Sequence, residues 1–196
     1  FVREGAASAD LLDDIIAEIT KAFREGASCV YFSEVFAKHQ YMLASQLQVY
    51  SQDVMRELLK SSCYGAFQSS KYYFYRKDRN PDADDDIRKF MRSSLVPLNY
   101  DSIHEQLWYV PIDTIKHCLV TTPELVNVAQ ETYFYAYNLP VNAAELNGIA
   151  DSLHSLLGQK NFVTDTEMRT LIGQKYTSVA INTADFTTWG LRNCLA

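Results

Sequence analysis

The sequence predicts a mainly α-helical α+β protein in which small β-hairpins recur between helices, and three observations indicate this class. The segment KYYFYRK, residues 71–77, recurs as ETYFYAY, residues 131–137, sixty positions later. The same offset superimposes YSQDVMRELL, residues 50–59, on VPIDTIKHCL, residues 110–119. Segments 50–59 and 110–119 have apolar residues three and four positions apart, which indicates amphipathic helices. The aromatic motifs that follow them, 71–77 and 131–137, are typical of strands. A helix followed by a hairpin therefore recurs.

A third copy of the repeated helix stands at the end of the sequence. FTTWGLRNCL, residues 186–195, places Leu191, Cys194 and Leu195 in the three apolar positions. No strand follows it, and the sequence begins with Phe1 rather than Met. We therefore expect a fragment of a larger protein, with a third unit that lacks its hairpin.

An opening helix is predicted before the repeated helix in the first and third copies. In the first copy its apolar stripe is Leu12, Ile15, Ile16, Ile19 and Phe23. In the third copy the stripe is Leu146, Ile149, Leu153, Leu156 and Leu157. Gly26 is expected to end the first helix, and the spacing of Asn142 and Glu145 is that of a capping box at the start of the other.

A short strand is expected after the opening helix. Val30 aligns with Val163 in this segment, and Val96 takes the same place in the second copy. The hairpins are predicted to turn at residues 68–70 and 129–131. The predicted unit is thus helix, strand, helix, helix, strand, turn, strand, a plausible size for a small domain.

This order resembles the winged-helix fold, in which the second and third helices form a helix-turn-helix and the hairpin is the wing. The resemblance implies tandem winged-helix domains, and the acidic segment NPDADDDIRK suggests a boundary between the first two. The predicted organisation is unit 1 at 1–78, an acidic linker at 79–86, unit 2 at 87–140, and unit 3, without its wing, at 141–196.

Composition limits the functional classes. The chain is 47% hydrophobic and 21% charged, with no apolar run that approaches the length of a membrane span. Residues 1–9 lack a signal-peptide pattern. Its four cysteines stand far apart without a C-x-x-C spacing, which favours buried thiols in a reducing cytoplasm over a disulfide framework. We expect a cytoplasmic protein that does not enter membranes.

Motifs for catalysis are absent from the sequence. It contains no phosphate-binding G-x-x-x-x-G-K-[ST], no zinc-binding H-E-x-x-H and no G-x-S-x-G nucleophile turn. The four histidines each lack a ligand-spaced neighbour, and His117 and Cys118 are adjacent on a helix, so they point in different directions. The sequence predicts a non-enzymatic protein without a metal or a cofactor.

The candidate DNA-binding residues lie on the outer face of the repeated helix and beside the first aromatic strand. One basic position recurs as Arg56, Lys116 and Arg192, where it would meet a phosphate or a guanine edge. The full predicted set is Gln52, Arg56, Lys60, Lys71, Arg76, Lys77, Lys116, Thr188, Arg192 and Asn193. A structural alternative is that Asp53 and Arg56, like Asp113 and Lys116, simply form i,i+3 pairs that solvate a helix.

Two functions remain open. The first is DNA binding, chiefly through unit 1. In unit 2, Glu131 replaces Lys71, and the basic residues that follow the aromatic motif of unit 1 have no counterparts. The alternative is a protein-interaction or architectural module, which the net charge of −6 favours. Its partners would be other protein domains, including the rest of its own chain. Its possible aromatic anchors are Trp108, Tyr109, Tyr133, Tyr135 and Tyr137.

Overall fold

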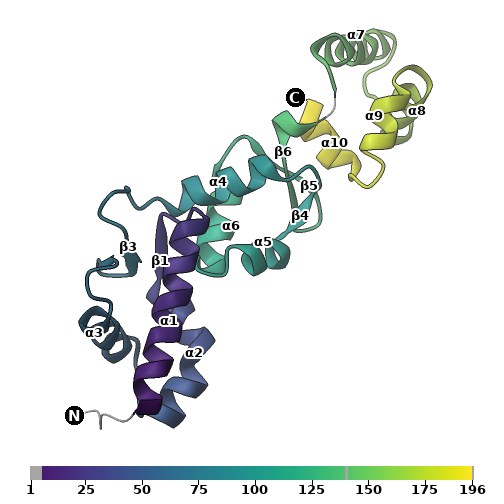
Figure 1. Cartoon of the computed structure of the whole chain (residues 1–196). Helices are drawn as coiled ribbons and strands as arrows, with labels where there is room; N and C mark the ends of the chain where they lie inside the picture. The colour runs from purple at the N-terminus through teal and green to yellow at the C-terminus, as the bar shows by residue number, and fades with distance from the viewer. Residues whose placement is uncertain (1–5, 140, 196) are drawn as a thin grey trace. The chain divides into compact units, whose positions relative to one another are not determined.

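The computed structural model describes residues 6–139 and 141–195, and it is mainly helical with two small antiparallel sheets (Figure 1). The predicted α+β class is confirmed. The first repeat comprises α1 (Ala6–Glu25), β1 (Cys29–Tyr31), α2 (Phe32–Leu47), α3 (Gln52–Ser62), β2 (Gln68–Ser69) and β3 (Tyr73–Tyr75).

The second repeat has the same order of elements. It comprises α4 (Ala83–Ser93), β4 (Leu98–Asn99), α5 (Tyr100–Gln106), α6 (Ile112–Thr121), β5 (Leu125–Ala129) and β6 (Thr132–Tyr135), followed by the 3-10 turn η1 (Ala136–Asn138). The strand orders also match, since β3 lies between β1 and β2, and β6 lies between β4 and β5. The third repeat comprises α7 (Ala143–Gln159), α8 (Asp165–Lys175), α9 (Thr177–Asn182) and α10 (Thr188–Leu195).

Packing divides the chain differently from the predicted three units. Among the described residues, one compact unit contains residues 6–89 and 101–118, and the other contains residues 90–100, 119–139 and 141–195. The segment predicted as unit 2, residues 87–140, is therefore shared between them. Val128 and Phe134 of the second hairpin are buried in one cluster with helices of the third repeat, which accounts for the division.

Aromatic side chains join the hairpin to the helices of the first repeat. Phe74 of β3 is fully buried and lies 4.6 Å from Phe32 and 4.8 Å from Phe67, between ring centroids. Phe67 in turn lies 6.1 Å from Phe23 near the end of α1. Gly26 follows α1 with φ 119°, a left-handed conformation that favours glycine, so the predicted helix end is confirmed.

The acidic segment predicted as an exposed linker, residues 79–86, is a linker only in its first half. Asp82 starts α4 by accepting a hydrogen bond from the Asp85 N–H at 3.0 Å. Acidic residues suit the first turn of a helix because its free N–H groups carry partial positive charge. Asp86 is buried, and its carboxylate accepts hydrogen bonds from both the N–H (2.8 Å) and the hydroxyl (2.9 Å) of Ser28.

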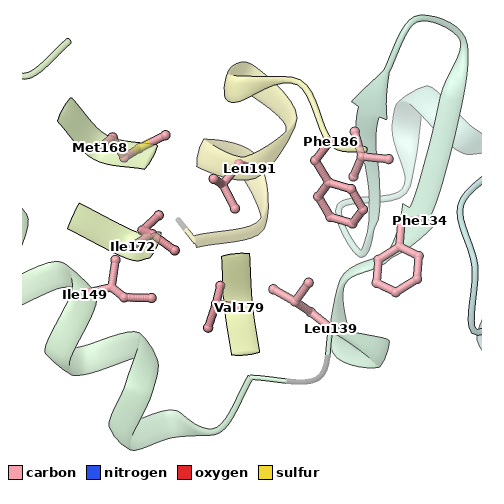
Figure 2. Close-up of a cluster of buried hydrophobic side chains, with 9 residues drawn as sticks. Phe134, Leu139, Ile149, Met168, Ile172, Val179, Phe186 and Leu191 are labelled. Carbon is pink, nitrogen blue, oxygen red and sulfur yellow. The ribbon is translucent and has the colours of Figure 1, made fainter. Parts of the chain in front are cut away.

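The second hairpin contributes to the core of the third repeat (Figure 2). Its buried residues are Val128, Phe134, Leu139, Ile149, Met168, Ile172, Val179, Phe186 and Leu191. The ring centroids of Phe134 and Phe186 are 5.8 Å apart. The Thr187 N–H donates to the Val128 carbonyl at 2.7 Å, so the outer edge of β5 is capped at the start of α10. A Cβ at Gly190 would lie 2.2 Å from that same carbonyl oxygen, so only glycine fits there.

The core positions of the repeated helix are confirmed, whereas two strand details differ from prediction. Met55 and Ile115 are fully buried, and Leu191 is 1% exposed. In the second repeat, β4 begins at Leu98, and Val96 is exposed rather than in the strand. Leu98 pairs with Tyr133 as Tyr31 pairs with Tyr73, so the strand is shifted by one residue from the alignment of Val96 with Val30. A one-residue shift moves each side chain to the other face of the strand. The segment around Val163 is not assigned as a strand.

Candidate functional site

A hollow of about 390 Å³ lies between the start of α2, the start of α3 and the turn of the β2–β3 hairpin. Its lining residues are Tyr31, Phe32, Ser33, Gln52, Asp53, Arg56, Lys71 and Tyr72. Gln52, Arg56 and Lys71 of the predicted DNA-binding set are thus brought together here from two elements. We refer to it as the first hollow.

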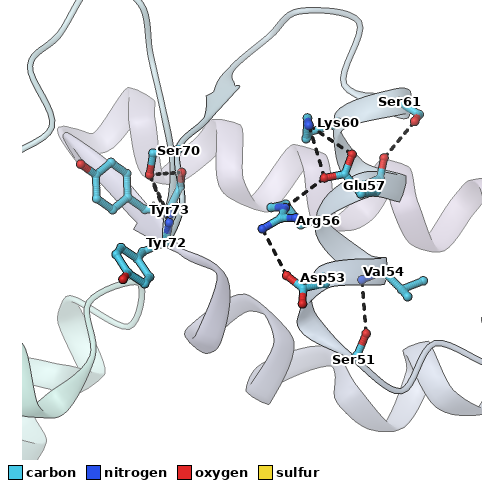
Figure 3. A network of polar contacts seen from close by, with 10 residues as sticks. All are labelled: Ser51, Asp53, Val54, Arg56, Glu57, Lys60, Ser61, Ser70, Tyr72 and Tyr73. Carbon is cyan, nitrogen blue, oxygen red and sulfur yellow. Dashed lines mark hydrogen bonds and ion pairs between the residues drawn. The ribbon is translucent and has the colours of Figure 1, made fainter.

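Local sequence fixes the side of α3 that faces this hollow. Ser51 is the N-cap, and its hydroxyl accepts a hydrogen bond from the Val54 N–H at 3.3 Å (Figure 3). Met55 and Leu59 are fully buried on the inner face. Gln52 lies three residues before Met55 and seven before Leu59, on the same side of the helix, and it is exposed because it is the first residue of α3. Arg56 is half-buried rather than turned fully outward as predicted.

The hairpin turn is held by hydrogen bonds that place Lys71 beside the hollow. The Ser70 hydroxyl oxygen accepts from the N–H groups of Tyr72 (3.2 Å) and Tyr73 (3.3 Å). The Tyr72 carbonyl accepts from the Phe32 N–H at 3.0 Å, which ties the turn to the start of α2. The Lys71 ammonium lies 5.0 Å from the centre of the Tyr72 ring.

The bases of α3 are paired with neighbouring acids. Arg56 lies 3.2 Å from Asp53 and 3.1 Å from Glu57 (Figure 3). Lys60 lies 3.1 Å from Glu57, and hydrogen bonds from Lys60 and Arg56 lower the pKa of Glu57. The predicted structural alternative, an i,i+3 pair of Asp53 and Arg56, is therefore present. Exposed pairs of this kind are strongly screened by solvent and readily exchange partners.

The three basic side chains after β3 make different contacts. Arg76 donates two hydrogen bonds to Asp78, at 2.8 and 2.7 Å, and these lower the pKa of Asp78. Arg79 donates to the Gly26 carbonyl at 3.1 Å, which ties the hairpin to the end of α1. Lys77 is exposed. Neither Lys77 nor Arg79 has an ion pair among the described contacts, and Lys77 also lacks a described hydrogen bond.

The charge of this region opposes that of the rest of the chain. Residues 51–79 hold six basic and three acidic side chains, whereas the remaining residues hold twelve basic and twenty-one acidic ones. Even with every acid of this segment paired, α3 and the hairpin keep an excess of positive charge. Such an excess attracts polyanions at low salt.

The other predicted residues do not join the first hollow. Lys116 is exposed on α6. Thr188, Arg192 and Asn193 belong to α10 of the other compact unit. The Thr188 hydroxyl already accepts a hydrogen bond from Arg169 at 3.1 Å. The predicted set is thus three converging residues and several that lie apart.

The predicted aromatic anchors have mixed positions. Tyr109 and Tyr133 are buried, at 8% and 6% exposure, so they belong to cores. Trp108 and Tyr135 are half-buried, and Trp108 lies beneath the Lys38 ammonium at 4.1 Å from its ring. Tyr137 is 77% exposed and is the member of this set best placed to contact another molecule.

A second hollow, not predicted from the sequence, lies in the third repeat and has a volume of about 500 Å³. Its lining residues are Leu153, Leu157, Asn161, Phe162, Val163, Thr164, Asp165, Met168 and Arg192. One signal was available, the apolar stripe of α7. Among the described residues, no hairpin of the third repeat covers the end of this stripe.

The comparisons with known proteins leave the family open: the chain matches no protein-family model, no curated protein and no solved structure. Within residues 6–139 and 141–195, no helix combines the length and apolar character needed to cross a membrane. In the same ranges, no three His, Cys, Asp or Glu side chains are grouped as metal ligands.

Proposed function

We propose that the chain is built from winged-helix repeats and binds duplex DNA through the first repeat, without enzymatic activity. In this proposal α3 is the recognition helix and the β2–β3 hairpin is the wing. The order of elements and the matching strand orders of the first two repeats support the winged-helix assignment.

One observation carries the DNA proposal: Gln52, Arg56 and Lys71 converge on the first hollow from both the helix and the hairpin. The amide of Gln52 can reach a base edge, while the two cations suit phosphates. Lys77, exposed at the end of the hairpin, adds a further cation. Asp53 and Glu57 oppose phosphate approach, so we expect weak and strongly salt-dependent binding.

The test is a fluorescence-anisotropy titration of short duplexes at several salt concentrations. Each phosphate contact contributes about −0.9 to the slope of log affinity against log salt. Replacing Lys71, Arg76 and Lys77 by alanine should weaken binding to every sequence and flatten this slope. Replacing Arg56 should also relax base preference, whereas Lys116→Ala should have a smaller effect.

A charge-removal variant gives the sharper result. Asp53→Asn with Glu57→Gln releases Arg56 and Lys60 from their acids, so DNA binding should tighten. Asp151→Asn with Asp185→Asn changes the net charge equally, at exposed positions of the third repeat, and should leave affinity nearly unchanged. Equal effects of the two pairs, or no binding at low salt, would contradict DNA binding at the first hollow.

A second candidate function is protein interaction, and a specific observation favours it. The second hollow exposes apolar side chains, with Leu157 46% and Phe162 66% accessible. Clustered apolar exposure of this kind is typical of interaction sites. If the DNA titrations fail, this surface becomes the leading candidate.

A further inference from the structure

The second hollow is the counterpart of a region that is covered in the first repeat. When the apolar stripes of α7 and α1 are aligned in sequence, Ile149 corresponds to Ile15, and both are buried, at 1% and 0% exposure. The same alignment matches Leu157 with Phe23. Phe23 is 2% exposed and Leu157 is 46% exposed, so the two helices differ at their C-terminal ends.

The covering element in the first repeat is the hairpin. Phe23 contacts Phe67 just before β2, and Phe67 contacts Phe74 on β3. Val30 of β1 pairs with Phe74 in an antiparallel register and is fully buried. Val163 aligns with Val30 in the sequence, yet it is only half-buried and lines the second hollow.

The backbone beside the second hollow is extended at Lys160 and at Thr164, and the three residues between them have free pairing groups. Lys160 has φ −154° and ψ 156°, and Thr164 has φ −76° and ψ 158°. Between them, Asn161, Phe162 and Val163 form no backbone hydrogen bond with any other residue that the structure describes. Unpaired N–H and C=O groups between two extended residues offer an edge for strand addition.

We propose that the second hollow binds an extended aromatic segment of a partner protein, which pairs with residues 161–164 as β3 pairs with β1. The aromatic residue opposite Val163 would cover Leu157 and Met168, as Phe74 completes the core of the first repeat. Both hairpins of this chain show the pattern that fits, YFY at residues 73–75 and at residues 133–135. This inference is independent of the proposed DNA binding.

The charge at the rim of the second hollow indicates a second property of the partner segment, an acidic residue. Arg192 takes the position of Arg56, but the counterparts of Asp53 and Glu57 are Trp189 and Asn193, which carry no charge. Among the described residues, Arg192 has no ionic partner and is exposed at the rim of the hollow. Asp165 also lines the hollow, but it lies in the first turn of α8, where the helix N-terminus offsets its charge. An acidic residue beside the aromatic pattern is therefore favoured.

The probe is a labelled peptide with the sequence ETYFYAY, which combines the aromatic pattern with an acidic residue. We expect saturable binding to the full chain in fluorescence anisotropy, in the micromolar rather than the nanomolar range, because the buried area is small. Hydrogen exchange should show new protection of the amides of residues 161–164 in the presence of the peptide.

Two exposed positions test the site without removing a core residue. Leu157→Asp and Phe162→Asp should each weaken peptide binding at least tenfold. Ile181→Asp is the matched control, since Ile181 is 70% exposed on α9 of the same compact unit and does not line the hollow, and binding should be unchanged. Circular dichroism establishes that each variant keeps its helices.

Two modified peptides test the mode of binding. Replacing the central phenylalanine by aspartate should abolish binding, and N-methylation at alternate residues should weaken it at least tenfold by removing ladder hydrogen bonds. The proposal is overturned if ETYFYAY does not bind the folded chain, if Leu157→Asp and Phe162→Asp bind it normally, or if the N-methylated peptide binds equally well. Loss of DNA binding in a separate titration would leave these results unaffected.

Discussion

The first and third repeats contain similar opening helices, α1 and α7, that pack against different neighbours. The difference shows how much apolar surface a small hairpin can bury. In the first repeat, the hairpin buries the C-terminal end of α1 through Phe67 and Phe74. In the third repeat, the described residues include no such hairpin, and the matching end of α7 is exposed at Leu157. The same apolar pattern therefore forms a core in one place and an open surface in another.

The aromatic motif written twice in the sequence shows the same principle. Phe74 packs against Phe32 and Phe67 within its own repeat, whereas Phe134 packs against Phe186 of the third repeat. Both phenylalanines are buried, so the motif has the same local role. The residues next to the motif in the sequence do not determine which helices its phenylalanine packs against.

The largest expected contrast is between Phe23→Ala and Leu157→Ala. Truncation of the buried Phe23 removes its contact with Phe67 and leaves a cavity, so the first compact unit should lose about 3–5 kcal/mol of unfolding free energy. Truncation of the half-exposed Leu157 should cost less than about 1 kcal/mol. Denaturant titration of single-tryptophan variants separates the units, because Trp108 and Trp189 belong to different ones. Equal losses would mean that Leu157 is covered in solution.

A second contrast concerns Gly190 and the residue that aligns with it in the first repeat, Val54. A Cβ at position 190 would meet the backbone of Val128, so Gly190→Ala should destabilise the second compact unit by about 1–3 kcal/mol. Val54 is 46% exposed, so Val54→Ala should change stability by less than about 0.5 kcal/mol. Thermal unfolding of the two variants measures the difference, and a neutral Gly190→Ala would show that α10 does not rest on β5.

The smallest expected effect is a pH dependence specific to the first repeat. Ser28 is held by buried Asp86, whereas Asn161, which aligns with Ser28, is exposed. Burial raises the pKa of Asp86 despite the hydrogen bonds from Ser28, so the folded chain binds this proton more strongly than the unfolded chain does. The contribution of Asp86 to stability should therefore become more favourable as pH falls through its folded pKa towards the ordinary value near 3.8.

Asp86→Asn removes this titration while keeping a side-chain oxygen that can accept from Ser28. Relative to this variant, the native chain should gain stability as pH falls, as measured by urea titrations between neutral and mildly acidic pH. Asp84→Asn, an exposed change in the same helical turn, controls for the loss of one charge. A stability difference between native and Asp86→Asn chains that stays constant with pH would contradict the assignment.

Much of the candidate site was predictable because it depends on local periodicity. The burial of Met55 and Leu59 was predicted from their spacing and is confirmed, whereas Gln52 is exposed as the first residue of α3 and Arg56 is half-buried. The pairing of Arg56 with Asp53 was foreseen from their spacing. The joining of Lys71 to these residues required the fold, because it depends on the hydrogen bond between Phe32 and the Tyr72 carbonyl.

The sequence by itself determined the repeat, both hairpins and the helices with a clear apolar stripe, because each depends on apolar spacing and turn chemistry within a few residues. It did not reveal α4, which begins inside the predicted linker, and it placed the first hairpin turn at residues 68–70, where the structure has β2. Tertiary structure alone decided which surfaces meet. It showed that Asp86 is buried beside Ser28, that Gly190 lies against the Val128 backbone, and that Leu157 stays exposed. Local patterns specify an apolar face, but its burial depends on distant segments whose approach no short-range pattern encodes.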